Sequence, residues 1–162
     1  MSGAVLKLVG MIAVFLSAWL ASRSLSGRER AAVAQIEGYI ALFRVIRSGI
    51  LYYRAPLADI LTRCDADVLF ACSGRGEVLR CDSLLAMAEG SFFDDKTLES
   101  IVHRAASELG RSLGESESAL CDRYIEELTE LCRMRSVRAR EQTRLVGTLL
   151  FAGAAGIVIL LM

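Results

Sequence analysis

The two ends of the chain are almost continuously apolar. Residues 4–21 form a run of 18 residues whose only charge is Lys7, and residues 145–162 form an uncharged run of 18 residues. A helix rises about 1.5 Å per residue, so each run reaches about 27 Å, close to the thickness of bilayer hydrocarbon. The pattern therefore predicts one transmembrane helix at 4–21 and another at 145–162.

Each run has an alternative interpretation. The first could be a cleaved signal peptide, but its first three residues carry no side-chain charge, and a cut after Ala21 would put Trp19 where a small residue is needed. The second could be a buried core helix, but a helix that is apolar on every face needs a larger domain around it. We favour an uncleaved anchor and a second membrane span.

Basic residues stand on the inner side of both runs. They are Arg23, Arg28, Arg30, Arg138, Arg140 and Arg144. Positive charge close to a span stays on the cytoplasmic side, so residues 23–144 are predicted to face the cytoplasm. The same arginines could instead bind anionic lipid or the acidic groups of a partner.

Apolar positions between the runs recur with a helical period, and no stretch alternates as a strand would. The first set predicts a helix over 29–54. Its members are Val33, Ile36, Tyr39, Ile40, Phe43, Ile46, Ile50 and Tyr53. Pro56 restricts the residue before it and suits the first turn of the next helix, which is predicted over 57–71.

Glycines and polar caps divide the rest of the region. Ser73-Gly-Arg-Gly breaks the pattern, and a shorter segment at 78–88 is expected to end at Gly90. Asp94 or Asp95 is the expected N-cap of a helix with an apolar stripe. That stripe comprises Leu98, Ile101, Val102, Ala105 and Leu109.

The last predicted helix begins near residue 115 and contains neither glycine nor proline as far as Val146. Its apolar face comprises Leu120, Cys121, Tyr124, Ile125, Leu128, Leu131 and Cys132. The face fades across residues 138–144, which are polar apart from Ala139. We expect one helix of about 72 Å that leaves the bundle and enters the membrane as the second span.

Composition adds few candidates for chemistry. The 19 basic and 19 acidic side chains balance, which argues against nucleic acid as a partner. The five cysteines form no metal-binding motif and are expected to be small apolar residues in a reducing compartment. His103 is the only histidine, and no nucleophile–base set can be assembled. The sequence predicts no enzyme, no catalytic residue, no metal, no cofactor and no small-molecule substrate.

Four short motifs, in order along the chain, resemble the stage III sporulation protein AB (SpoIIIAB) family. They are LKLVG at 6–10, RAPL at 54–57, LGRSLGESE at 109–117 and RLVG at 144–147. The positions that carry the resemblance are Lys7, Gly10, Pro56, Leu57, Gly110, Leu113, Gly114 and Gly147. Alone each motif is weak, but their order between two terminal apolar runs is fairly specific.

The resemblance implies a function. The family belongs to the SpoIIIA–SpoIIQ channel complex of endospore-forming bacteria, and its cytoplasmic part is similar to the inner-membrane platform proteins of type II secretion and type IV pilus systems. It implies a place in the mother-cell membrane around the forespore, with the secretion-type ATPase (SpoIIIAA) and other SpoIIIA channel subunits as partners. Homo-oligomer formation stays open.

Two functions follow as expectations. The first is an all-α structural platform, with a cytoplasmic helical bundle between two membrane helices, that couples a cytoplasmic ATPase to the channel. The alternative is a membrane-anchored sensor or regulator whose bundle binds a ligand or a signalling partner. A cavity with convergent polar groups would favour the sensor.

Overall fold

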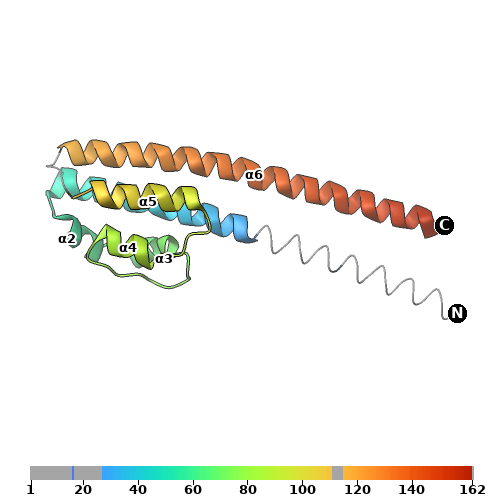
Figure 1. The fold of residues 1–162 in the computed structure, drawn as a ribbon, viewed down its shortest axis with the longest axis horizontal. Coiled ribbons are helices and arrows are strands. Elements are labelled where there is room, and N and C mark those ends of the chain that lie inside the picture. The colour runs from blue at the N-terminus through green and yellow to red at the C-terminus, as the bar shows by residue number, and fades with distance from the viewer. Residues whose placement is uncertain (1–15, 17–26, 111–114, 162) are drawn as a thin grey trace. The chain divides into compact units, whose positions relative to one another are not determined.

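The computed structural model describes residues 16, 27–110 and 115–161, and it is helical throughout, without a strand in these ranges (Figure 1). The elements are helix 27–48, the π-helix η1 (Gly49–Tyr53), α2 (Leu57–Thr62), α3 (Ala66–Ser73), α4 (Leu84–Gly90), α5 (Lys96–Glu108) and α6 (Glu115–Leu161). The predicted all-α class is confirmed. The chain divides into two compact units: one is Ala31–Arg135, and the other joins Met1–Arg30 to Ser136–Met162.

The two predicted membrane spans stay predictions. Across the residues that the structure describes, none of the helices combines the length and the apolar composition that a membrane crossing requires. Residues 4–21 lie outside the described part apart from Leu16. Of the second run, the described part is the backbone of α6 as far as Leu161, with little of its side chains.

Helix 27–48 forms the centre of the unit Ala31–Arg135. The predicted stripe is buried at Ile36, Tyr39, Phe43 and Ile46, each fully shielded from solvent. Gly38 sits where this helix crosses α3, and a Cβ there would lie 2.7 Å from the Cβ of Ala71. The two backbones therefore approach as closely as they do because position 38 has no side chain.

The predicted end of this stripe is wrong at Tyr53, which is 80% exposed. From Gly49 the helix continues as a π-helix, whose wider turn contains one more residue than an α-helical turn allows. Each extra residue rotates the following side chains by about 100°, so Tyr53 leaves the buried stripe that Ile50 still follows. The helix ends at Arg54, which has a left-handed conformation with φ 47°.

The single helix predicted over 57–71 is in fact two helices. Pro56 precedes α2 as predicted, but α2 ends at Thr62, and the side chain of Asp65 accepts a hydrogen bond from the Asp67 amide to begin α3. An exposed aspartate is as compatible with a helix surface as with an N-cap, so the periodicity alone could not locate this break.

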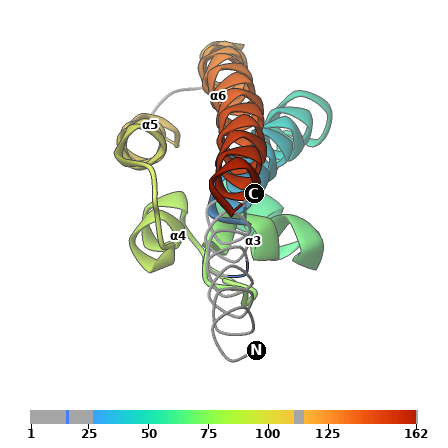
Figure 2. The same cartoon turned by 90° about the vertical axis from the view of Figure 1, so that its right-hand side faces the viewer.

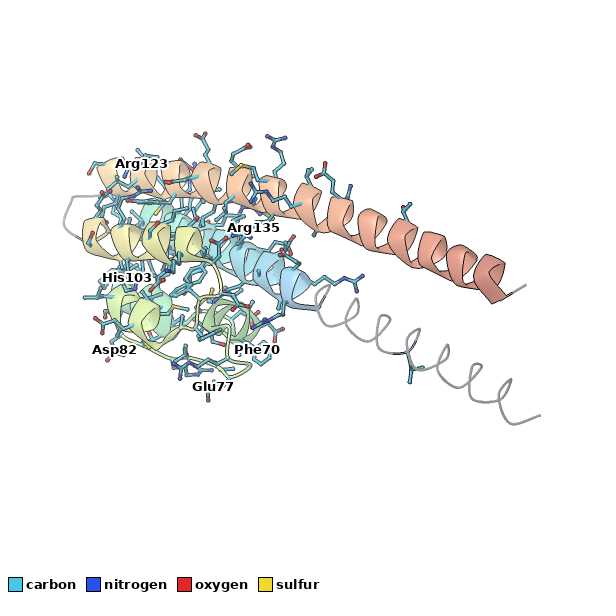
Figure 3. All side chains as sticks on the ribbon, turned by 45° about the vertical axis from the view of Figure 1, so that its right-hand side comes forward. Phe70, Glu77, Asp82, His103, Arg123 and Arg135 are labelled. Atoms are coloured by element: carbon cyan, nitrogen blue, oxygen red, sulfur yellow. The ribbon has the colours of Figure 1, made fainter. Side chains whose placement is uncertain are left out.

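The segment predicted as helical from Val78 begins later. Gly74 and Gly76 have φ values of +65° and +76°, which ends α3 as the glycines predicted, and α4 begins only after its N-cap Ser83. Figure 3 shows Glu77 and Asp82 on this connecting segment, where both are exposed. The predicted end at Gly90 is confirmed.

Helix α5 follows the prediction closely. Asp95 is its N-cap, and its five predicted apolar residues are all buried. It packs against α4, beside which it lies in Figure 2.

Helix α6 is unbroken over 47 residues, as predicted. Its apolar face contributes Cys121, Tyr124, Leu128 and Leu131 to the core of the unit Ala31–Arg135. The other three predicted members, Leu120, Ile125 and Cys132, pack against that core while partly buried.

Gly38→Ala should lower the free energy of unfolding by about 1–3 kcal/mol. The new Cβ would also lie 3.1 Å from the Ala71 carbonyl carbon, so backbone has to move, and this outweighs alanine's better helix propensity of about 1 kcal/mol. Guanidinium unfolding of the full chain in detergent, followed by circular dichroism, measures it. Gly27→Ala is the control, since no atom lies within 4 Å of its Cβ. Equal guanidinium midpoints for Gly38→Ala and Gly27→Ala would contradict the close packing of helix 27–48 on α3 at Gly38.

Candidate functional site

A surface groove lies between helix 27–48 with its π-helical end and α2. Its volume is about 670 Å³. Gly49 and Ile60 are buried at its base, where a Cβ on Gly49 would lie 2.5 Å from Cδ1 of Ile60. A side chain at position 49 would therefore push α2 away and change the shape of the groove.

The walls of the groove combine apolar and charged side chains. Val45 and Tyr53 supply apolar surface and are 38% and 80% exposed. Arg44 and Arg63 supply positive charge from opposite elements, and Asp59 is the single acidic residue of the lining. Since most of the lining is exposed, the groove is shallow and open to solvent.

The two groove arginines have no ion-pair partner among the described residues. Some arginines of the same unit are paired, such as Arg47, which lies 2.6 Å from Asp122, and Arg104, which lies 2.5 Å from Glu127, whereas Arg75 forms no ion pair within the described part either. The groove therefore offers two guanidinium groups whose donors are open to an external carboxylate or phosphate.

The sequence did not predict this groove. The spacing predicts Tyr53 within the buried stripe, and nothing in the pattern distinguishes Arg44 and Arg63 from the other polar positions of the predicted helices. The only signal was the pair Tyr52 and Tyr53 just before Pro56, a concentration of aromatic surface at a predicted helix end.

Two of the motif positions come together although they are far apart in sequence. A Cβ on Gly110 would lie 3.9 Å from Cδ2 of Leu57, the first residue of α2. Gly110 has φ +88°, a conformation that favours glycine, and its N–H donates to the Glu117 carboxylate at 3.0 Å. These residues shape a turn and a helix start, which is a structural role.

The remaining predicted positions are dispersed. Lys7, Gly10, Arg23, Leu113 and Gly114 lie outside the described residues. Arg28 and Arg30 are exposed on helix 27–48, and Arg138 and Arg140 are exposed on α6. Gly147 and Arg144 belong to α6, but their side-chain surroundings are outside the description.

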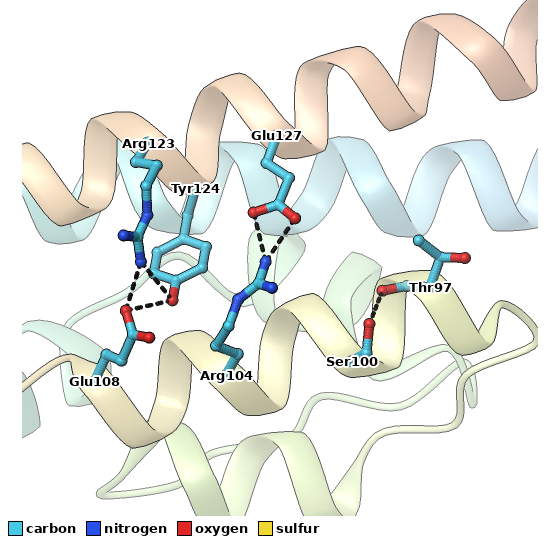
Figure 4. A network of polar contacts seen from close by, with 7 residues as sticks. All are labelled: Thr97, Ser100, Arg104, Glu108, Arg123, Tyr124 and Glu127. Atoms are coloured by element: carbon cyan, nitrogen blue, oxygen red, sulfur yellow. Dashed lines mark hydrogen bonds and ion pairs between the residues drawn. The ribbon is translucent and has the colours of Figure 1, made fainter.

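A polar network joins α5 to α6 (Figure 4). Arg104 donates to both carboxylate oxygens of Glu127, and Arg123 and the Tyr124 hydroxyl both donate to Glu108. The guanidinium of Arg123 also lies 4.9 Å from the centre of the Tyr124 ring. Because the four charged side chains are 39–55% exposed, water screens both ion pairs, and the network serves mainly to align the helices.

Asp95 makes two contacts from a buried position. One carboxylate oxygen accepts from the Thr97 amide at 2.9 Å and caps α5, while the other lies 2.6 Å from Nη2 of Arg135 on α6. The second contact lacks the alignment of a hydrogen bond, so it is an ion pair. The carboxylate of Asp95 thus caps α5 and also holds the start of this helix against Arg135 on α6.

Four of the five free cysteines are held as neutral thiols. Burial raises the pKa of Cys121 to about 11, and it likewise raises the pKa of Cys64, Cys72 and Cys132. A thiol with a raised pKa is a poor nucleophile near neutral pH. These residues act as small apolar side chains, and Cys72 is fully buried.

His103 is half-buried with its ring centre 6.4 Å from that of Phe93. Figure 3 shows it on α5, and it is not among the residues that line the groove. Nowhere in the described ranges do three or more His, Cys, Asp or Glu side chains gather as a metal site would require. Among the described residues the groove is therefore the candidate site for an external ligand.

Comparison with known protein families, with curated proteins and with solved structures finds no match to this chain.

Replacing Asp95 should separate its two roles. Asp95→Asn keeps an N-cap of equal quality and removes the charge opposite Arg135, whereas Asp95→Ala removes both. Both variants should unfold at lower guanidinium concentration, and the alanine variant should lose about 1 kcal/mol more. Identical losses would show that the cap contributes nothing to stability.

The Glu108 contacts should make stability depend on pH. The Tyr124 hydroxyl and then Arg123 lower the pKa of Glu108 below its usual 4.5. A lowered folded-state pKa gives stability that is present above about pH 4.5 and is lost as the pH falls through the lower value. Glu108→Gln should therefore be less stable than the native chain at neutral pH. Its stability should also fall less than that of the native chain between pH 4.5 and 3.

Thermal unfolding midpoints across this range measure the effect. Glu99→Gln is the matched control, because Glu99 is an exposed residue of α5 that makes no ion pair within the described part. A steeper acid decline in Glu108→Gln than in the native chain would contradict the assignment.

Proposed function

We propose that the chain is a membrane-anchored helical platform that couples a secretion-type ATPase to the SpoIIIA channel complex. In this proposal residues 4–21 and 145–162 cross the mother-cell membrane around the forespore, and residues 23–144 face the cytoplasm. The chain itself performs no reaction; it holds partners in place and transmits movement.

The observation that carries the proposal is the continuity of α6. Its first part packs in the core of the unit Ala31–Arg135, and its later part belongs to the other unit and contains the uncharged run 145–162 as far as Leu161. Over 47 residues the helix extends about 70 Å. An unbroken helix transmits force along its axis, which suits a part that links a cytoplasmic motor to a membrane channel.

The first test is membrane association together with partner capture. The tagged full chain, expressed in its native host, should stay in the membrane fraction after alkaline carbonate extraction. After detergent extraction it should co-purify with the secretion-type ATPase of that host. Release by carbonate would overturn the anchors, and capture of channel subunits without the ATPase would limit the platform to a scaffold role.

Ser136→Pro should disable function while leaving the bundle folded. Proline removes a helical hydrogen bond and costs about 3 kcal/mol in a helix interior, but among the described side chains of α6 the last one buried in the core is Leu131, before this position. Spore formation should fall sharply, and the buried Cys72 thiol should stay protected from alkylation. Ser136→Ala is the control and should sporulate normally. Normal sporulation in the proline variant would contradict mechanical coupling.

The groove favours a second candidate, a membrane-anchored sensor whose bundle binds a ligand. Its volume of about 670 Å³ is within the range of small-molecule sites, and Arg44, Arg63 and Asp59 are polar groups that face a common space. Small-molecule sites usually enclose most of their ligand, however, and this lining is mostly exposed. The platform therefore remains the better-supported proposal.

A further inference from the structure

The helix end beside the groove exposes large aromatic side chains that are not buried in the core of the bundle. Tyr52 and Tyr53 are 78% and 80% exposed, and Leu51 is 41% exposed. The π-helical turn produces this placement, and Arg54 then holds a left-handed conformation that disfavours residues other than glycine. Both features cost stability and are concentrated at functional sites in proteins.

The groove beside them has a defined chemistry. Its base and one wall are apolar, through Ile60, Val45 and the ring of Tyr53. Arg44 lies on helix 27–48, and Arg63 follows α2, so positive charge comes from both elements that form the groove. With Asp59 as the only acid among the lining residues, the lining has a net positive charge.

We propose that this groove binds an acidic, aromatic segment of a partner protein. Carboxylates of the segment would receive hydrogen bonds from Arg44 and Arg63, since guanidinium groups suit carboxylates well. An aromatic side chain between the carboxylates would pack on Ile60 and against Tyr53. This inference rests on the proposed platform function, because it assigns the surface through which the platform holds its cytoplasmic partner.

An extended segment fits this groove better than a small molecule does. The lining residues are mostly exposed, so they cover one side of a ligand and leave the other in water. Peptide segments are commonly held in this way, with affinity spread over several contacts along an open surface. The exposed Tyr52 and Leu51 extend apolar surface beyond the groove, as a ligand longer than the groove would require.

The direct test measures binding of a defined probe to the full chain in neutral-lipid nanodiscs. The probe is a short fluorescent peptide that alternates glutamate with tryptophan in a serine background. Two matched peptides replace glutamate by lysine or tryptophan by serine. Only the first should bind strongly, and its affinity should fall as salt is raised.

Variants then locate the binding site. Arg63→Glu should weaken binding by about tenfold or more, because a charge-assisted hydrogen bond is replaced by repulsion. Tyr53→Ala should also weaken it. Arg75→Glu is the matched control: Arg75 is an exposed arginine outside the groove lining, and this variant should bind normally. Arg63 and Tyr53 are exposed, so circular dichroism should show both variants folded.

Co-purification separates this inference from the function on which it rests. If the native chain captures the ATPase and Arg63→Glu does not, both proposals are supported. If Arg63→Glu captures the ATPase as well as Arg75→Glu does, the platform stands and the groove assignment is wrong. If the native chain captures no ATPase, the coupling to the ATPase fails, and the peptide assay alone decides whether the groove binds an acidic, aromatic segment.

The same peptides and variants distinguish two other possible ligands of the groove. Self-association of the native chain that Arg63→Glu abolishes, without peptide binding, would assign the groove to a second copy and overturn the proposal. Equal binding of the peptides with tryptophan and with serine would reduce the groove to a simple anion site, which would also overturn it.

Discussion

Burial of helix 27–48 on several sides is the constraint on which the rest of the bundle depends. Gln35 donates hydrogen bonds to the carbonyls of Cys72 and Phe92, at 3.0 and 2.8 Å. The hydroxyl of Tyr39 lies 2.9 Å from Oγ of Ser91, and the ring of Phe43 stacks on Tyr124 with centres 6.0 Å apart. Helix 27–48 thus contacts the end of α3, the segment after α4 and the buried face of α6. Without it these elements would lose both their apolar partner and their hydrogen bonds.

The same constraint explains which features the sequence could predict. Local patterns predicted the stripe of α5 and the buried face of α6, because each depends on helical spacing within one element, and they narrowed the N-cap of α5 to Asp94 or Asp95. The break at Asp65 was not predictable in this way: Ile60, Leu61, Cys64 and Leu69 are buried on both sides of it and keep a spacing that one helix could also produce. The burial of the polar residue Gln35 could not be predicted either, because the two carbonyls that accept its hydrogen bonds are 37 and 57 positions away in the sequence.

The groove is formed by the packing of two helices against each other, so no local sequence motif could predict it. Gly49 allows α2 to approach, and Ile60 occupies the space that a side chain at position 49 would need. Ile50 remains buried while the wider π-helical turn directs Tyr53 outward. A regular α-helix would have continued the apolar stripe through Tyr53, as the spacing predicted, and would have removed the aromatic wall of the groove.

The surface arginines of the unit differ in what they can do. Arg104 and Arg123 form ion pairs with carboxylates on the neighbouring helix, where exposure to water weakens each pair. Pairs of this kind specify how α5 lies on α6 more than they stabilise the fold. Arg44 and Arg63 lie on either side of apolar surface, and no carboxylate in the described ranges forms an ion pair with them. A charge beside a partly shielded apolar surface interacts more strongly than one in open water, because less water competes for it. Two arginines without an internal carboxylate partner therefore flank the apolar part of the groove, where the carboxylates of the proposed segment would meet both.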